Sequence, residues 1–560
     1  MSGKIRIFSL GGLDEDGKNM TCIEVGDQIY VIEAGMKYPD AKESLGIEFI
    51  IPDFSYLIEN KSRIAGVFIT HAHDDVMGSL SYLLKQIHVD VYASPFTMMF
   101  IEKMIAEEGI RGIRLHYVDR HDELIIGGRK VIFFPVTHTC PGTFGLAIET
   151  KQGYVVYSGE FIEDYDVLSD RYRGDLTTFG ELRTDGVLAL LTDSKGADRS
   201  GHTSPDHRLR EKFTKVLELN QGKRIFISLY TQSVYWIQEV IEQCIKYNRK
   251  IVLYTEEARE LVARLEKVDY DIPRIYRDYF LDPDMYDPSD KNVVIIITET
   301  GKTLIKLMSN ICNNEVDDIE FRKDDIICMA NPVLAGTDRD FKRMENDIYK
   351  EEGEIIALDK GTNSMHPARE DLKMMIFMTR PKYYIPIKGE YRKLVMNEEI
   401  GSSMGYDDDK IVILDNGQVA TFEHGELVSC EKELELYDTL IDGKEKWDVA
   451  GVVLRDREIL STDGVIILAI GIDSRTKKII NGPDIQTRGL VYLKDAEYIT
   501  GDVAKIMEET IEEDVRNRVY DNVETRQVIR ERVSRYLVKT IAKRPMILPV
   551  ILEINTSSNS

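Results

Sequence analysis

Short apolar runs recur along this chain, and each ends in charged or polar side chains. Five of them, rich in β-branched and aromatic residues, cover residues 67–70, 131–137, 153–159, 188–192 and 382–387. Such runs are typical of buried strands, and the leucines at helical spacing over 78–86 predict a helix after the first one. Open α/β sheets bind ligands beyond the carboxyl ends of their strands, so the pattern predicts an α/β protein with a site at a sheet rim.

The side chains at these strand ends are metal-ligand types. In chain order they are His71, His73, Asp75, His138, Glu160, Asp193 and Lys388. Two histidines one residue apart can direct both imidazoles at one cation, and a carboxylate two residues later can serve a neighbouring cation. A surface His-x-His-x-Asp also arises by chance, but the later strand ends supply partners and make a metal site the stronger interpretation.

Four longer segments carry a family resemblance, together with the 71–75 motif. They are residues 11–19, 51–57, 364–372 and 386–392. On these motifs the chain resembles metallo-β-lactamase-fold nucleases, and more narrowly ribonuclease J of the β-CASP group, over nearly its whole length. Within that family it is most similar to the divergent second paralogue found in Gram-positive bacteria.

The resemblance implies a domain plan. It comprises a metallo-β-lactamase αββα sandwich over 1–205 and 360–429, an inserted β-CASP α/β domain over 206–359, a linker over 430–449, and a small C-terminal α/β domain over 450–560. The family uses its C-terminal domain for dimerisation. Strands are predicted there at 464–470, 489–493 and 546–554, and from spacing alone the two intervening helices could simply cover their own sheet.

Departures from the family pattern fall on the ligands. Where the family has His at the end of its first motif, Asp at the strand-end acid and His before the late glycine, this chain has Val76, Glu160 and Lys388. The first metal of the family would be held by His71, His73 and His138 with Glu160, and these imidazoles are intact. The second would keep Asp75 but lacks both histidines. We therefore expect at most one ion per subunit, zinc or manganese, and weak hydrolysis.

A lysine at position 388 has a physical rationale. Buried carboxylates without their cation are costly, and an ammonium is a compact cation that can neutralise them. The hypothesis is that Lys388 occupies the second metal position and pairs with Asp75 and Glu160. The alternative is that Lys388 points to solvent and leaves that position empty.

The resemblance also assigns catalytic and substrate groups. Asp75, Asp193 and His366 are the expected catalytic residues, with Asp193 supporting the site rather than binding metal directly. The expected phosphate-binding segment is Thr362, Asn363, Ser364, Met365 and His366. Met365 replaces a glycine of the family and should narrow the phosphate pocket. Tyr235 and Trp236 replace an imidazole and a guanidinium; they could stack on bases, but packing is the favoured interpretation.

The composition of the chain limits its domain number, its cellular compartment and its expected partners. The chain has 560 residues, 43% of them hydrophobic, which suits about three domains. Its six cysteines show no Cys-x-x-Cys spacing and no apolar run is long enough to span a membrane, so a cytoplasmic, reduced, soluble protein is expected. The formal net charge of −25 opposes tight RNA binding and favours a partner subunit.

The expected function is RNA processing and decay, including rRNA maturation and mRNA turnover. We expect a weak metal-dependent 5′-to-3′ exoribonuclease with possible endonuclease activity. It would act mainly beside an active ribonuclease J paralogue, as a homodimer, heterodimer or tetramer, with an RNA degradosome as a wider partner. One alternative is a catalytically inactive scaffold. Another is a single-metal hydrolase of small esters, which the β-CASP insertion and the 364–372 motif disfavour.

Overall fold

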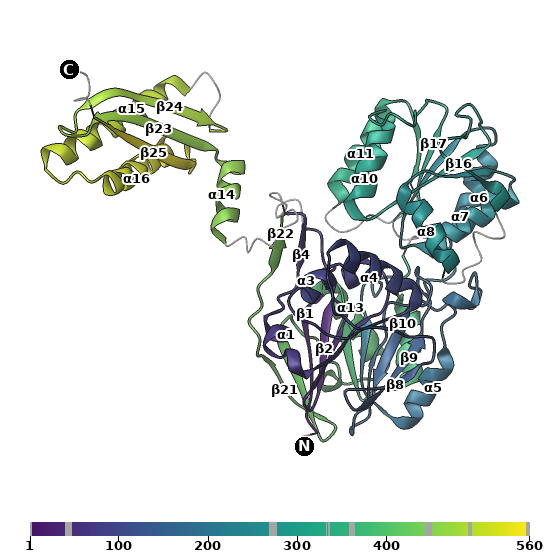
Figure 1. Ribbon diagram of the computed structural model, residues 1–560. Coiled ribbons are helices and arrows are strands. Elements are labelled where there is room, and N and C mark those ends of the chain that lie inside the picture. The colour runs from purple at the N-terminus through teal and green to yellow at the C-terminus, as the bar shows by residue number, and fades with distance from the viewer. Residues whose placement is uncertain are drawn as a thin grey trace. The chain divides into compact units, whose positions relative to one another are not determined.

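The computed structural model divides into two compact units, Met1–Gly443 and Lys444–Ser560 (Figure 1). It describes residues 3–39, 47–267, 277–331, 333, 337–357, 364–442, 451–490 and 496–555. Each unit has its own hydrophobic core, and each is considered by itself below.

Two sheets form the centre of the first unit. One has the order β21 (Glu426–Lys432), β20 (Gln418–Glu423), β1 (Ile5–Gly11), β2 (Met20–Val25), β3 (Gln28–Ile32), β5 (Ile64–Ile69), β6 (Val91–Ala93) and β7 (Leu115–Tyr117). The other has the order β19 (Tyr383–Ile387), β12 (Val187–Asp193), β11 (Tyr154–Tyr157), β10 (Phe144–Ile148), β9 (Arg129–Pro135) and β8 (Glu123–Ile126). Side chains from both, among them Phe68 and Phe133, share one core between the sheets.

Helices cover the outer faces of both sheets. On the first sheet they are α1 (Ser55–Glu59), α2 (Asp74–Met77), α3 (Leu80–Leu84) and α4 (Pro95–Glu107), and on the second α5 (Leu176–Asp185), α12 (Arg369–Thr379) and α13 (Tyr391–Ser403). Single 3-10 turns lie at Lys61–Arg63, Asp170–Tyr172, Arg277–Tyr279 and Asp408–Lys410. The four layers confirm the predicted αββα sandwich, and the five predicted strands correspond to β5, β9, β11, β12 and β19.

A third sheet lies within the long segment between β12 and α12. Its strands are all parallel, in the order β15 (Phe280–Leu281), β14 (Lys250–Leu253), β16 (Val293–Glu299), β13 (Ile225–Tyr230), β17 (Ile326–Met329) and β18 (Glu354–Ala357). Its helices are α6 (Leu209–Leu219), α7 (Val234–Lys246), α8 (Glu256–Lys267), α10 (Gly301–Cys312) and α11 (Asp338–Lys350). Helices pack on both faces, which explains why its central strands are continuous apolar runs.

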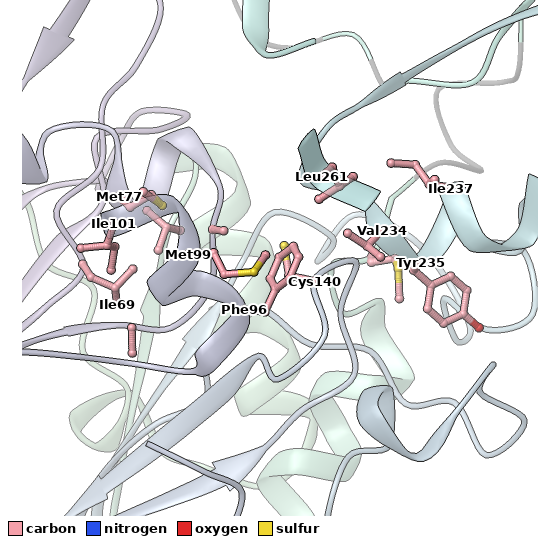
Figure 2. Close-up of a cluster of buried hydrophobic side chains, with 14 of the residues drawn as sticks. Ile69, Met77, Phe96, Met99, Ile101, Cys140, Val234, Tyr235, Ile237 and Leu261 are labelled. Carbon is pink, nitrogen blue, oxygen red and sulfur yellow. The ribbon is translucent and has the colours of Figure 1, made fainter. Parts of the chain in front are cut away.

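This inserted sheet domain joins the sandwich through a continuous hydrophobic cluster. Figure 2 shows Phe96 and Met99 of α4 with Cys140 on one side, and Val234 and Leu261 of α7 and α8 on the other. The backbone N–H of Tyr235 also donates to the carbonyl of Thr139, at 3.0 Å. The insertion therefore packs directly beside the loop that follows His138.

The segment predicted as a linker contains paired backbone. Besides the end of β21, it includes β22 (Thr439–Ile441), which pairs antiparallel with β4 (Phe49–Ile51). The ammonium of Lys18, almost fully buried, also binds Asp438. The chain is thus held against the sandwich up to residue 442.

The second unit is a small α/β domain. It comprises α14 (Gly451–Thr462), β23 (Val465–Asp473), β24 (Ile479–Arg488), α15 (Ala496–Arg516), α16 (Asn522–Ile541) and β25 (Met546–Ile554). The sheet order is β24-β23-β25, and α15 and α16 bury one face of it, so these helices do cover their own sheet.

One predicted strand of this domain, at 489–493, lies mostly outside the described residues. The run at 489–493 begins with Gly489 and Leu490, which are bends, and 491–493 lie outside the described residues. The preceding strand, β24, was not predicted, because its many polar residues alternate with half-buried ones and leave no apolar run to detect. In the described parts of the chain, no helix is long and apolar enough to cross a membrane.

Candidate metal centre

The strand-end residues meet at one rim of the sandwich. His71 and His73 follow β5, and His138 follows β9 on the facing sheet. Glu160 comes after β11, and Lys388 directly follows β19. Because both sheets end at the same rim, residues far apart in sequence converge, as the strand pattern predicted.

Three imidazoles and one carboxylate form the tightest group. The ligand atoms of His71, His73, His138 and Glu160 all lie within 4.8 Å of one another. The Nε2 atoms of His71 and His138 lie 3.6 and 3.5 Å from Oε2 of Glu160. The imidazole centroids are 4.5 to 5.0 Å apart, with the rings edge to face.

Outer hydrogen bonds fix which nitrogen of each ring faces inward. The Thr70 hydroxyl donates to Glu33 at 2.9 Å, so its oxygen accepts from Nδ1–H of His71 at 3.0 Å. His138 donates its Nδ1–H to the carbonyl of Met365 at 3.0 Å. Both Nε2 atoms therefore direct lone pairs at the Glu160 carboxylate. Such outer partners are usual for metal-binding histidines.

The inward-facing atoms are acceptors without a donor. Nε2 of His71, Nε2 of His138 and Oε2 of Glu160 are buried, and none has a hydrogen-bond partner among the described residues. Burial holds the pKa of both imidazoles well below the ordinary value, which keeps them neutral. Three acceptors facing one another are costly without a cation between them. The residues therefore fit one metal ion, and neutral imidazole with carboxylate suits zinc or manganese.

His73 completes this group from the side of the inserted domain. Its Nε2 lies 2.9 Å from the hydroxyl of Thr139, which leaves the other ring nitrogen for an ion. Burial also lowers the pKa of His73. All three histidines predicted as ligands thus lie together in a neutral form.

Lys388 is buried in the site. Only 2% of the residue is exposed, so the solvent-facing alternative is wrong. Its Nζ donates to Oε1 of Glu33 at 2.8 Å and to Oε1 of Glu160 at 2.9 Å. Burial alone would lower the pKa of Lys388, but the two carboxylates outweigh it and hold the pKa well above the usual range. The expected contact with Glu160 is confirmed.

The expected contact between Lys388 and Asp75 is wrong. Oδ2 of Asp75 instead accepts from Nζ of Lys195 at 2.7 Å and from Nδ2 of Asn19 at 3.1 Å. Lys195 also reaches Oδ1 of Asp16 at 3.0 Å. Asp75 is the second residue of the short helix α2 (Asp74–Met77), and both Asp75 and Lys195 line the cleft. The oxygens of Asp75 are not among those that converge with the imidazoles.

Asp193 and His366 form a second close pair. Nδ1 of His366 lies 2.6 Å from Oδ2 of Asp193 and 3.6 Å from Oε2 of Glu160. Asp193 is fully buried, and its other oxygen accepts the backbone N–H of Lys195 at 2.8 Å. Asp193 thus lies where it can orient His366.

Some of the expected substrate-binding residues line a cleft, and others lie outside the described residues. A cleft of about 690 Å³ is lined by Ser364, Met365 and His366, together with residues of the imidazole group. Met365 is almost fully buried and fills the wall of this cleft, whereas Thr362 and Asn363 lie outside the described residues.

The remaining substituted positions are core residues. Val76 and Tyr235 have no exposed surface, and Trp236 lines the cleft while its Nε1–H donates to the carbonyl of His207. Packing, the favoured interpretation for Tyr235, agrees with this burial. Trp236 also packs, with one edge at the cleft.

Two members of the site were not predicted. Glu33 follows the apolar run at 29–32 directly, as the other site residues follow theirs. Lys195 comes two residues after Asp193. The same strand-end pattern could have found Glu33; a lysine in a polar loop gives no such signal.

Comparisons with known proteins agree with this geometry. Residues 49–207 match the model of a beta-lactamase superfamily domain, residues 222–348 that of the ribonuclease J beta-CASP domain, and residues 452–554 that of the ribonuclease J C-terminal domain. The protein named Ribonuclease J 2 of Staphylococcus epidermidis is 31% identical over 558 residues, which cover 98% of each chain. The chain belongs to the ribonuclease J family. Ribonuclease J 2 of Staphylococcus aureus is 31% identical over 557 residues, again 98% of each chain.

Membership of the ribonuclease J family confirms the resemblance stated from the motifs. The family consists of RNA-processing nucleases with a metallo-β-lactamase domain. A solved structure of a protein of unknown function from Enterococcus faecalis also shares the fold, with a TM-score of 0.53 and 15% identity. It covers 75% of this chain and 100% of its own.

Proposed function

We propose that this ribonuclease J family member is a weak, single-metal 5′-to-3′ exoribonuclease. The observation that carries the proposal is the set of buried acceptors on His71, His138 and Glu160 that lack a donor. Together with His73 they would hold one zinc or manganese ion. When bound, the ion supplies Lewis-acid stabilisation of charge on a phosphoryl oxygen.

The residues around the ion would position RNA and move protons. His366 is partly exposed to the cleft and held by Asp193, so it can hold a proton beside a phosphate. The Ser364 hydroxyl lines the same cleft. The Met365 side chain occupies volume there and would restrict how closely a phosphate approaches. No second ion would share the charge of the attacking and leaving oxygens, so hydrolysis would be slow.

We further infer that the chain works mainly as a partner subunit in the cytoplasm. A net charge of −25 weakens its own RNA binding. On the sheet face of the C-terminal unit away from its helices, Ile467, Leu548 and Leu552 are exposed. That face, in a domain that the family uses for dimerisation, suits a second copy or an active paralogue, in a dimer, a tetramer or a larger RNA-degrading complex.

The alternative is an inactive scaffold that stabilises or guides such a paralogue. The burial of Lys388 against Glu160 favours it, because this ammonium occupies a place where the family would use a second cation. Cleavage by the purified chain distinguishes the two proposals.

The test is degradation of 5′-monophosphorylated RNA by the purified chain with added manganese. The comparison is a His71→Ala/His73→Ala double variant, whose fold is checked by circular dichroism. We expect slow exonucleolytic cleavage that the double variant loses by at least tenfold. Equal activity in both, or none in either, would favour the scaffold.

A further inference from the structure

Four carboxylates beside the imidazole group are joined in pairs by two ammonium groups. Lys388 binds Glu33 and Glu160 at 2.8 and 2.9 Å. Lys195 binds Asp75 and Asp16 at 2.7 and 3.0 Å. Lys388 is buried, and the Lys195 side chain is 16% exposed on the cleft wall.

The two pairs belong to one electrostatic unit. Asp16, Asp75, Glu160 and Lys195 all line the same cleft, and Lys388 binds Glu160. The two ammonium groups together carry a formal charge of +2, the charge of one divalent cation. Carboxylate oxygens are the ligands that Mn²⁺ and Mg²⁺ prefer.

Glu160 links this unit to the candidate metal. Its Oε1 accepts from Lys388, while its Oε2 faces the imidazoles of His71 and His138. A bridging carboxylate between two cations would have the same division of its oxygens. The backbone of Lys388 has φ of 60°, an unusual conformation for a residue with a side chain, and it directs the ammonium inward.

We propose that Lys195 and Lys388 together replace a second divalent cation in this site. Val76 and Lys388 cannot act as ligands of a second ion, so these residues do not fit a two-metal site. The ammonium groups of the two lysines supply the positive charge instead. Lys388 neutralises the buried side of the position and Lys195 the side that faces the cleft. The proposal deepens the single-metal function proposed above, but it concerns ion binding and does not require RNA cleavage.

The test is ion stoichiometry. We would measure bound manganese per chain by equilibrium dialysis with elemental analysis and by calorimetry, for the wild type and a Lys195→Ala/Lys388→His variant. The wild type should bind one ion. The variant should bind two, because removal of both ammonium groups leaves the carboxylates uncompensated and adds an imidazole ligand.

A lysine on the same cleft wall provides the matched control. Lys393 also lines the cleft, but it binds Asp198 outside the carboxylate unit, so Lys393→Ala should leave the count at one. The single variant Lys195→Ala retains the buried Lys388 and should bind a second manganese ion with lower affinity. It provides a second test if the double variant does not fold.

Either of two results would overturn the proposal: two ions in the wild type, or no gain in both folded Lys195 variants. The ribonuclease proposal can be rejected independently of this one. A wild type that binds one ion without cleaving RNA, beside a variant that binds two, would reject the activity and keep the lysine substitution.

Discussion

The charge of the Glu160 carboxylate is balanced in different ways at its two oxygens, Oε2 and Oε1. On the Oε2 side, neutral imidazoles and the carboxylate present acceptors without donors, and only an added cation can satisfy them. On the Oε1 side, Lys388 already satisfies Glu160 and Glu33. The first half is built to bind an ion and the second is complete without one. If Lys195 and Lys388 replace a second cation as proposed, ion-binding chemistry is lost on one side of Glu160 while the charge balance is kept.

The largest expected effect on stability comes from removing the ammonium that satisfies the Oε1 side of Glu160. Lys388→Met keeps the length of the side chain but leaves Glu33 and Glu160 buried without their ammonium, which should cost roughly 3–5 kcal/mol of unfolding free energy. Denaturant unfolding of the metal-free protein measures this cost. The control is Lys382→Met, which removes an ion pair with Glu426 at the surface and should cost less than about 1 kcal/mol. Equal losses in the two variants would contradict a special role for Lys388.

Glu239 is a buried carboxylate without a close cation, in contrast to Glu160, whose pKa Lys388 helps to hold well below the usual range against the effect of burial. Oε2 of Glu239 accepts the backbone N–H groups of Leu209 and Arg210, but its nearest cation is the Arg210 guanidinium at 3.9 Å. Burial raises the pKa of Glu239 to about 7. A raised carboxyl pKa contributes stability below the unfolded-state value near 4.5, and this contribution is lost as the pH rises through about 7.

Glu239→Gln should remove that pH dependence. At about 1.4 kcal/mol per pH unit, the wild type should lose roughly 3 kcal/mol more than the variant between pH 4.5 and pH 8. Unfolding free energies across this range measure the difference. Parallel pH curves for the two proteins would show that Glu239 needs no ammonium partner.

A smaller effect should follow from loosening the ion-binding half. Thr70→Val keeps the shape but removes the hydroxyl that accepts from Nδ1–H of His71, so the ring loses its fixed tautomer. Loss of such an outer partner usually costs 10–100-fold in metal affinity. Calorimetric titration with zinc measures it, and Thr70→Ser, which retains the hydroxyl, should stay close to the wild type. Unchanged affinity in Thr70→Val would mean that the ring orientation does not depend on this bond.

Five strands of the sandwich, β5, β9, β11, β12 and β19, could be predicted because they are largely buried and apolar. The run 188–192 is apolar except for Thr192 at its end, and β12 covers that run within Val187–Asp193. β24 was missed for the opposite reason: it is an edge strand whose outward residues are polar, including Asp484, Gln486 and Arg488. The hydrophobic pattern detects burial, so an exposed strand escapes it.

The ion-binding half of the site could be predicted better than the lysine half. His71, His73 and His138 are rare residue types at the ends of recognisable strands, and they converge as expected. Which carboxylate each lysine binds depends on packing between loops that are distant in sequence. Lys388 therefore binds Glu33 rather than Asp75, and Lys195 had no distinguishing pattern in the sequence.

A cation that is covalently part of the chain cannot be removed by a chelator. The ammonium groups of Lys195 and Lys388 stay in place whatever the supply of zinc or manganese in the surroundings. Under metal starvation, a site that depends on two ions would expose its whole set of carboxylates to mutual repulsion. This chain would lose only the ion between its imidazoles, and its folded surface would remain available to other molecules.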